Sequence, residues 1–67
     1  MKQKNTIYRV SEVATGLYVE TGSIDEAMKM AIEHAKEYRD VYMEIYEVKN
    51  GRKYFVIGYN KKTGFYR

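Results

Sequence analysis

The stretch that decides the fold is SIDEAMKMAIEHAKEYRD, Ser23 to Asp40, the only segment with a clearly helical pattern. Ser23 stands three residues before Glu26, which is the spacing of a capping box. In that motif the serine hydroxyl accepts a hydrogen bond from the backbone of the glutamate. Asp25 and Glu26 also place negative charge at the positive end of the helix dipole. These signals predict a helix that begins just after Ser23.

The predicted helix has one apolar stripe and one charged face. At about 100° per residue, the stripe contains Ile24, Met28, Ala31, Ala35 and Tyr38, with Ala27 and Ile32 at its margins. Because alanine is small, we expect the helix to lie close to the element that it covers. Met30 falls among glutamates on the polar side, where it is either an ordinary exposed apolar residue or a contact for a partner.

The chain before the helix is predicted to form a hairpin, with strands from Thr6 to about Val13 and from Leu17 to Glu20. A three-residue loop would pair Val13 with Leu17, and a two-residue loop would pair Ala14 with Leu17. Since Thr15 is poorly suited to the positive φ of the tighter turn, the three-residue loop is favoured.

The chain after the helix predicts a second hairpin, because Asn50-Gly51 separates the strand-like runs VYMEIYEV (41–48) and KYFVIGYN (53–60). A two-residue loop pairs Lys49 with Arg52, and counting back pairs Tyr46 with Phe55 and Ile45 with Val56. The remaining residues, 61–67, are predicted either as a short return strand or as an arm over the sheet.

Cross-strand partners share a face, so this register divides the hairpin in two. One face holds Val41, Met43, Ile45, Tyr54, Val56 and Gly58. The other holds Tyr42, Glu44, Tyr46, Val48, Lys53, Phe55, Ile57 and Tyr59. Glu44 decides the orientation, because burying an unpaired carboxylate is costly. We therefore expect the first face, where Gly58 leaves room, to receive the helix, and the aromatic face to point outward.

The predicted fold is α+β, with ββαββ order and an antiparallel sheet of about four strands covered on one face by the helix. Residues 1–67 make a single domain, with residues 1–5 expected to be disordered. The chain has no cysteine, which excludes disulfides and fits a cytoplasmic protein. No run approaches the roughly 20 apolar residues of a membrane span. The net charge of +3 makes the chain mildly basic, which is well short of a dedicated polycationic binder.

The sequence contains no pattern of residues typical of a catalytic, cofactor or metal site, so we expect no enzymatic activity, no cofactor and no metal. His34 is the only imidazole and has no second histidine or cysteine to join it as a metal ligand. Glu44 and Glu47 lie on opposite faces of their strand, so they are not a facing carboxylate pair. The glycines do not form a phosphate-binding loop.

Two classes of binding function remain. The favoured one is contact with a protein partner, or a homodimer, through an aromatic surface, because tyrosine and arginine are enriched at interface hot spots. The alternative is single-stranded RNA or DNA, which stacks on aromatic rings and is attracted by a basic rim. Both use the same predicted residues: Tyr42, Tyr46, Phe55 and Tyr59 as the platform, Lys53 on it, and Arg52, Lys61, Lys62 and Arg67 around it.

Residues 16–38, GLYVETGSIDEAMKMAIEHAKEY, resemble the strand, turn and helix of HicB-type antitoxins. The resemblance is carried by Gly22, Ser23, Glu26, Ala27 and Ala31. Domains of that family bind a toxin, so the resemblance implies a protein partner. It transfers no functional residue, and the chain lacks the family's proline-rich strand connection.

Overall fold

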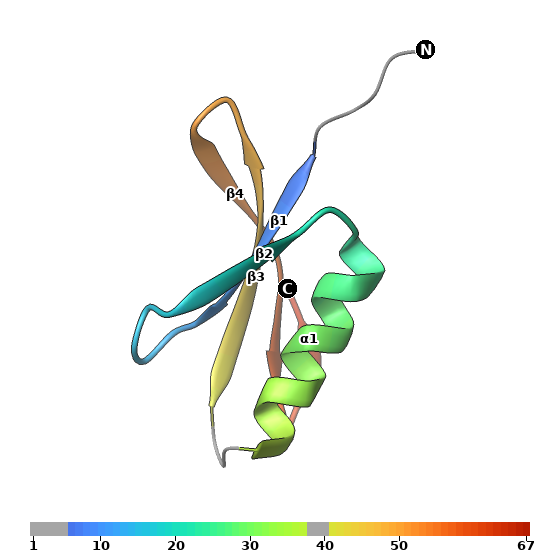
Figure 1. Ribbon diagram of the computed structural model, residues 1–67. Coiled ribbons are helices and arrows are strands. Elements are labelled where there is room, and N and C mark those ends of the chain that lie inside the picture. The colour runs from blue at the N-terminus through green and yellow to red at the C-terminus, as the bar shows by residue number, and fades with distance from the viewer. Residues whose placement is uncertain (1–5, 38–40) are drawn as a thin grey trace.

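The computed structural model describes residues 6–37 and 41–67. In chain order the elements are β1 (Ile7–Glu12), β2 (Tyr18–Thr21), α1 (Ile24–Glu37), β3 (Tyr42–Lys49), β4 (Arg52–Asn60) and β5 (Gly64–Tyr66). The strands form one antiparallel sheet in the order β2-β1-β3-β4-β5, with α1 on one face (Figure 1). The predicted α+β class is confirmed. The sheet has five strands instead of about four, because the tail returns beside β4. The expectations for residues 1–5 and for Tyr38 to Asp40 lie outside the described residues.

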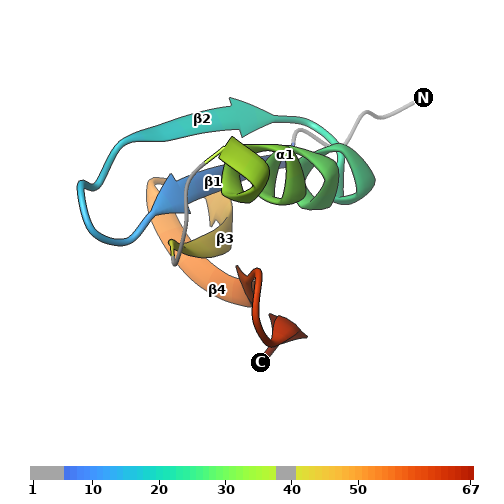
Figure 2. The same cartoon turned by 90° about the horizontal axis from the view of Figure 1, so that it is seen from below.

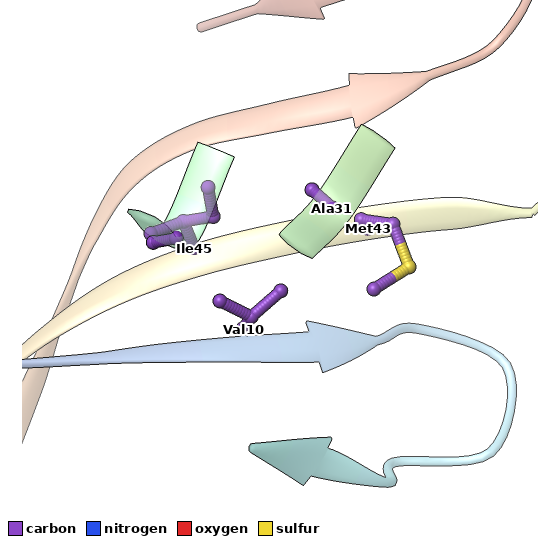
Figure 3. Packing of buried hydrophobic residues seen from close by; sticks show 5 residues of the cluster. Val10, Ala31, Met43 and Ile45 are labelled. Carbon is purple, nitrogen blue, oxygen red and sulfur yellow. The ribbon is translucent and has the colours of Figure 1, made fainter. Parts of the chain in front are cut away.

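Helix α1 begins as the sequence predicts. The Ser23 hydroxyl accepts a hydrogen bond from the backbone N–H of Glu26 at 3.2 Å. The helix buries its alanines, and the core between helix and sheet consists of Val10, Ala27, Ala31, Met43 and Ile45 (Figure 3). The small alanine side chains let the helix backbone lie close to β1 and β3, so the larger side chains of the sheet fill the core.

The sheet is strongly twisted and curves around α1, with β2 at one end of the arc (Figure 2). This curvature corrects the expectation for Met30. Met30 is half-buried and packs against the core cluster. A flat sheet would have left this flank of the helix exposed. The curved sheet brings β2 alongside it.

The first hairpin has a longer loop than either alternative that the sequence suggested. Ser11 pairs with Tyr18, and the N–H of Glu12 donates to the carbonyl of Leu17 at 2.8 Å. The loop therefore spans residues 13–16, and the pairing of Val13 with Leu17 is wrong. The left-handed conformation falls on Gly16, with φ of 79°, whose N–H donates to the Glu12 carbonyl at 2.8 Å. Thr15 avoids positive φ because the loop is extended to place glycine at that position.

The second hairpin turns where the sequence predicts. Asn50 and Gly51 have φ of 48° and 78°, as a type I′ turn requires, and the pairing is confirmed as far as Tyr46 with Phe55. Beyond that point a β-bulge shifts the register, so that Ile45 pairs with Ile57. The bulge determines how the apolar side chains of residues 55–57 divide between the two faces of the sheet. Phe55 stays beside Tyr46, while the next two side chains both pack against the core.

The bulge moves the second half of β4 to the opposite face from the predicted one. Ile57 and Tyr59 lie on the side of α1, where Tyr59 pairs with Met43, and Gly58 lies on the side of Glu44. The predicted positions of these three residues are therefore wrong, although Val56 does pack against the core. The room at Gly58 is filled by Tyr66 of β5, with which it pairs.

Asn60 ends β4 and is almost fully buried, with 2% of its surface exposed. Its side-chain amide donates to the carbonyl of Val41 at 2.9 Å and accepts from the N–H of Lys62 at 3.0 Å. Both polar atoms are thus satisfied, and the side chain ties the entry to β3 to the β4–β5 turn.

Candidate functional site: the outer face of the sheet

The sheet face opposite α1, which we call the outer face, is not covered by any other element within residues 6–37 and 41–67 (Figures 1 and 2). The registers place the following side chains on it: Ile7, Arg9 and Ser11 of β1, Tyr18 and Glu20 of β2, Tyr42, Glu44, Tyr46 and Val48 of β3, Lys53, Phe55 and Asn60 of β4, and Tyr66 of β5. Gly58 lies beneath Tyr66.

Tyr46, Phe55 and Lys53 form a cluster near the β3–β4 turn. The rings of Tyr46 and Phe55 meet edge to face, with centroids 5.9 Å apart, and the Lys53 ammonium lies 4.4 Å from the Tyr46 ring centre. Phe55 remains 46% exposed. The type I′ turn and the four confirmed pairs position this cluster, so the sequence was sufficient to predict it.

A second aromatic cluster lies at the other end of β3. Tyr42 and Tyr66 meet edge to face with centroids 6.4 Å apart. Glu44 stands between this pair and Tyr46, whose hydroxyl donates a hydrogen bond to the Glu44 carboxylate. That bond is the main cause of the raised pKa of Tyr46. Burial, followed by the charge of Glu44, raises the pKa of Tyr66. In both residues the shift favours the neutral phenol, which can donate a hydrogen bond.

Arg9 and Tyr18 extend the outer face onto β1 and β2. The Arg9 guanidinium bonds Glu20 at 2.9 Å and stacks 4.2 Å from the Tyr18 ring centre. Arg9, Tyr18 and Tyr66 were not predicted as part of this surface, because their place on it depends on strand order. Arg9 lies beside Tyr46 only since β1 pairs with β3.

The structure divides the predicted site residues. Tyr42, Tyr46, Phe55 and Lys53 share the outer face, whereas Tyr59 lies on the helix side, where its ring meets Phe65 at 4.6 Å. Arg52 begins β4, and Lys61 and Lys62 follow its last residue. The nine residues of β4 span about 26 Å, so these cations do not form one rim.

Charge on the outer face is balanced, because Arg9 and Lys53 are matched by Glu20 and Glu44. Arg9 bonds Glu20 directly, and Lys53 lies over an aromatic ring. The surface is therefore aromatic and amphipathic, and it is not a strip of positive potential.

A small groove of about 170 Å³ lies on the other side of the sheet, between β2 and α1. It is largely apolar, and its polar members are Glu12 and His34, whose Oε1 and Nε2 are 3.2 Å apart. The remaining lining residues are Val10, Leu17, Tyr18, Val19, Met30 and Met43. The volume is below the roughly 300 Å³ at which small-molecule sites begin.

In the described part of the chain, no three His, Cys, Asp or Glu side chains gather in a way that could hold a metal ion. Across residues 6–37 and 41–67 the structure contains no helix that could span a membrane. Comparisons with protein-family models, curated proteins and solved structures gave no match. The resemblance of residues 16–38 to HicB-type domains therefore stays a prediction.

Proposed function

We propose that this protein is a non-enzymatic binding module and that its outer face binds another protein. The observation that carries the proposal is an uncovered sheet face with exposed aromatic rings and balanced charge. Aromatic side chains bring a large contact area at a small cost in side-chain entropy, and tyrosine adds a hydrogen-bonding hydroxyl. Arg9 stacked on Tyr18 is a further pair of the residue types that are enriched at interface hot spots.

Nucleic acid is the second candidate, and the Lys53 ammonium over the Tyr46 ring favours it, since single-strand sites combine cations with stacking rings. The two carboxylates on the outer face oppose it, because they repel phosphate. A protein partner is compatible with all of these groups.

Two neighbouring residues give a matched test. Phe55 and Tyr54 are adjacent and similarly exposed, at 46% and 48%, but Phe55 lies on the outer face and Tyr54 on the opposite one. We expect immobilised wild-type protein and the Tyr54→Ser variant to capture the same partner from an extract of the native host. Phe55→Ser should lose it, and the purified partner should bind this variant at least about tenfold more weakly. Equal capture by all three proteins would refute the outer face as the binding surface.

The nucleic-acid alternative is tested by titrating labelled single-stranded DNA and RNA at low and high salt. Binding that weakens with salt and requires Phe55 would favour nucleic acid over a protein partner. The absence of any salt-sensitive binding would eliminate it.

A further inference from the structure

Strand β2 forms one edge of the sheet, and among the described residues no strand pairs with its outer side (Figure 2). Exposed edges are usually protected by lysine, proline or a bulge, or by being very short. The other edge, β5, has three residues. Strand β2 is also short, with the four residues YVET and one charged side chain, Glu20, but it has neither lysine nor proline, and its register with β1 is continuous.

Apolar side chains are exposed along this edge and at the residue that precedes it. Leu17 is 70% exposed, Tyr18 53% and Val19 52%. Leu17 and Val19 also form the β2 wall of the apolar groove beside α1. A second strand placed against β2 would therefore cover apolar surface as well as satisfy backbone groups.

The hydrogen-bonding pattern between β1 and β2 identifies which backbone N–H and C=O groups of β2 point outward. The N–H of Glu12 in β1 donates to the Leu17 carbonyl, so these two residues occupy a hydrogen-bonded position of the β1–β2 ladder. Bonded and non-bonded pairs alternate along an antiparallel ladder. Val19 therefore bonds to β1, whereas the N–H and C=O groups of Tyr18 and Glu20 point away from the sheet.

We propose that two copies of this protein pair through β2 across a two-fold axis, antiparallel, with Val19 directly opposite Val19 of the second copy. In this register Tyr18 exchanges both backbone hydrogen bonds with Glu20 of the second copy, and the symmetry repeats the exchange. The two sheets become one, and both helices lie on the same side of it.

A two-fold axis normal to the sheet allows only those register shifts that keep each residue on its face. Among these allowed registers, side-chain chemistry favours the one centred on Val19. Centring on Glu20 would put two carboxylates opposite each other, which is destabilising. Centring on Tyr18 would place Glu20 opposite Gly16, outside β2. With Val19 at the centre, the Glu20 carboxylate keeps its 2.9 Å contact with the Arg9 guanidinium of the same copy. On its other side it meets the Tyr18 ring of the second copy.

The absence of native cysteine permits a direct test of the register. Residues opposite each other in a non-bonded pair have Cα atoms about 4.5 Å apart, which is within disulfide range. Under mild oxidation, Val19→Cys should form a disulfide-linked dimer at least about tenfold faster than Val13→Cys. Val13 is a fair control, because it is also about half exposed, at 51%, but precedes β2. Equal rates would overturn the register.

Sedimentation over a concentration series tests the dimer itself. Wild type and Val13→Lys should dimerise alike, whereas Val19→Lys, which sets two ammonium groups face to face, should weaken dimerisation at least about tenfold. Far-UV circular dichroism of each variant checks folding. A wild type that is monomeric at all concentrations would overturn the proposal. So would a dimer that Phe55→Ser dissociates and Val19→Lys does not, because that result assigns self-association to the outer face.

Discussion

Replacing Gly58 by alanine should destabilise the protein, although alanine normally improves a strand. A Cβ atom at residue 58 would lie 2.5 Å from Cζ and 2.8 Å from the hydroxyl oxygen of Tyr66. Real Cβ atoms do not approach so closely, so the Tyr66 ring must leave its place over β4. The backbone at Gly58 has no positive φ, so backbone strain does not contribute.

The expected magnitude follows from two opposing effects. Forcing a side chain out of a packed site costs about 1–3 kcal/mol, which here includes the edge contact between Tyr66 and Tyr42. Alanine in place of glycine in a strand returns about 0.5–1 kcal/mol. We therefore expect Gly58→Ala to lower the free energy of unfolding by about 1 kcal/mol, and by at most about 2.5 kcal/mol. With a urea m-value of roughly 1 kcal/mol/M, the midpoint should fall by about 1 M.

The assay is a double-mutant cycle by urea denaturation. In a Tyr66→Ala background the clash is absent, so Gly58→Ala should change sign and stabilise by about 0.5–1 kcal/mol. Gly22→Ala is the matched control, because the nearest atom to its Cβ is 3.9 Å away, and it should be close to neutral. If Gly58→Ala destabilises equally with and without the Tyr66 ring, the ring is not the cause and the reasoning is refuted.

Three further predictions concern single side chains. Asn60→Ala should lower the free energy of unfolding by about 1–3 kcal/mol in urea denaturation, because the buried side chain's hydrogen bonds to the Val41 carbonyl and from the Lys62 N–H are both lost; a loss below about 0.5 kcal/mol would contradict this role of Asn60. Asn50→Ala should cost about 1–2 kcal/mol because φ is 48°, while Asn50→Gly should be nearly neutral. Glu44→Ala, which removes the acceptor as well as the charge, should lower the pKa of Tyr46, measured by NMR of the tyrosine ring carbons; no change would exclude Glu44 as the cause of the shift. Since the folded pKa of Tyr46 lies above the unfolded value near 10.0, its contribution to stability is complete below that pH and is lost as pH rises through the folded pKa.

Local signals in the sequence determined the parts of the fold that depend on neighbouring residues. The cap at Ser23, the alanine stripe of α1 and the left-handed turn at Asn50-Gly51 depend on contacts within a few residues, so the sequence contains everything needed to predict them. The Tyr46–Phe55 cluster follows from the turn by counting, and for that reason this part of the candidate site was predictable.

Tertiary structure decided the rest, because the local sequence was compatible with more than one arrangement. The bulge at Val56 is favoured only when a core exists to receive both Val56 and Ile57, and it reverses the faces of Gly58 and Tyr59. The order of strands likewise places Arg9 beside Tyr46 and leaves β2 at an edge. Strand neighbours far apart in the chain are selected by burial of apolar surface over the whole sheet, which no single stretch of sequence encodes.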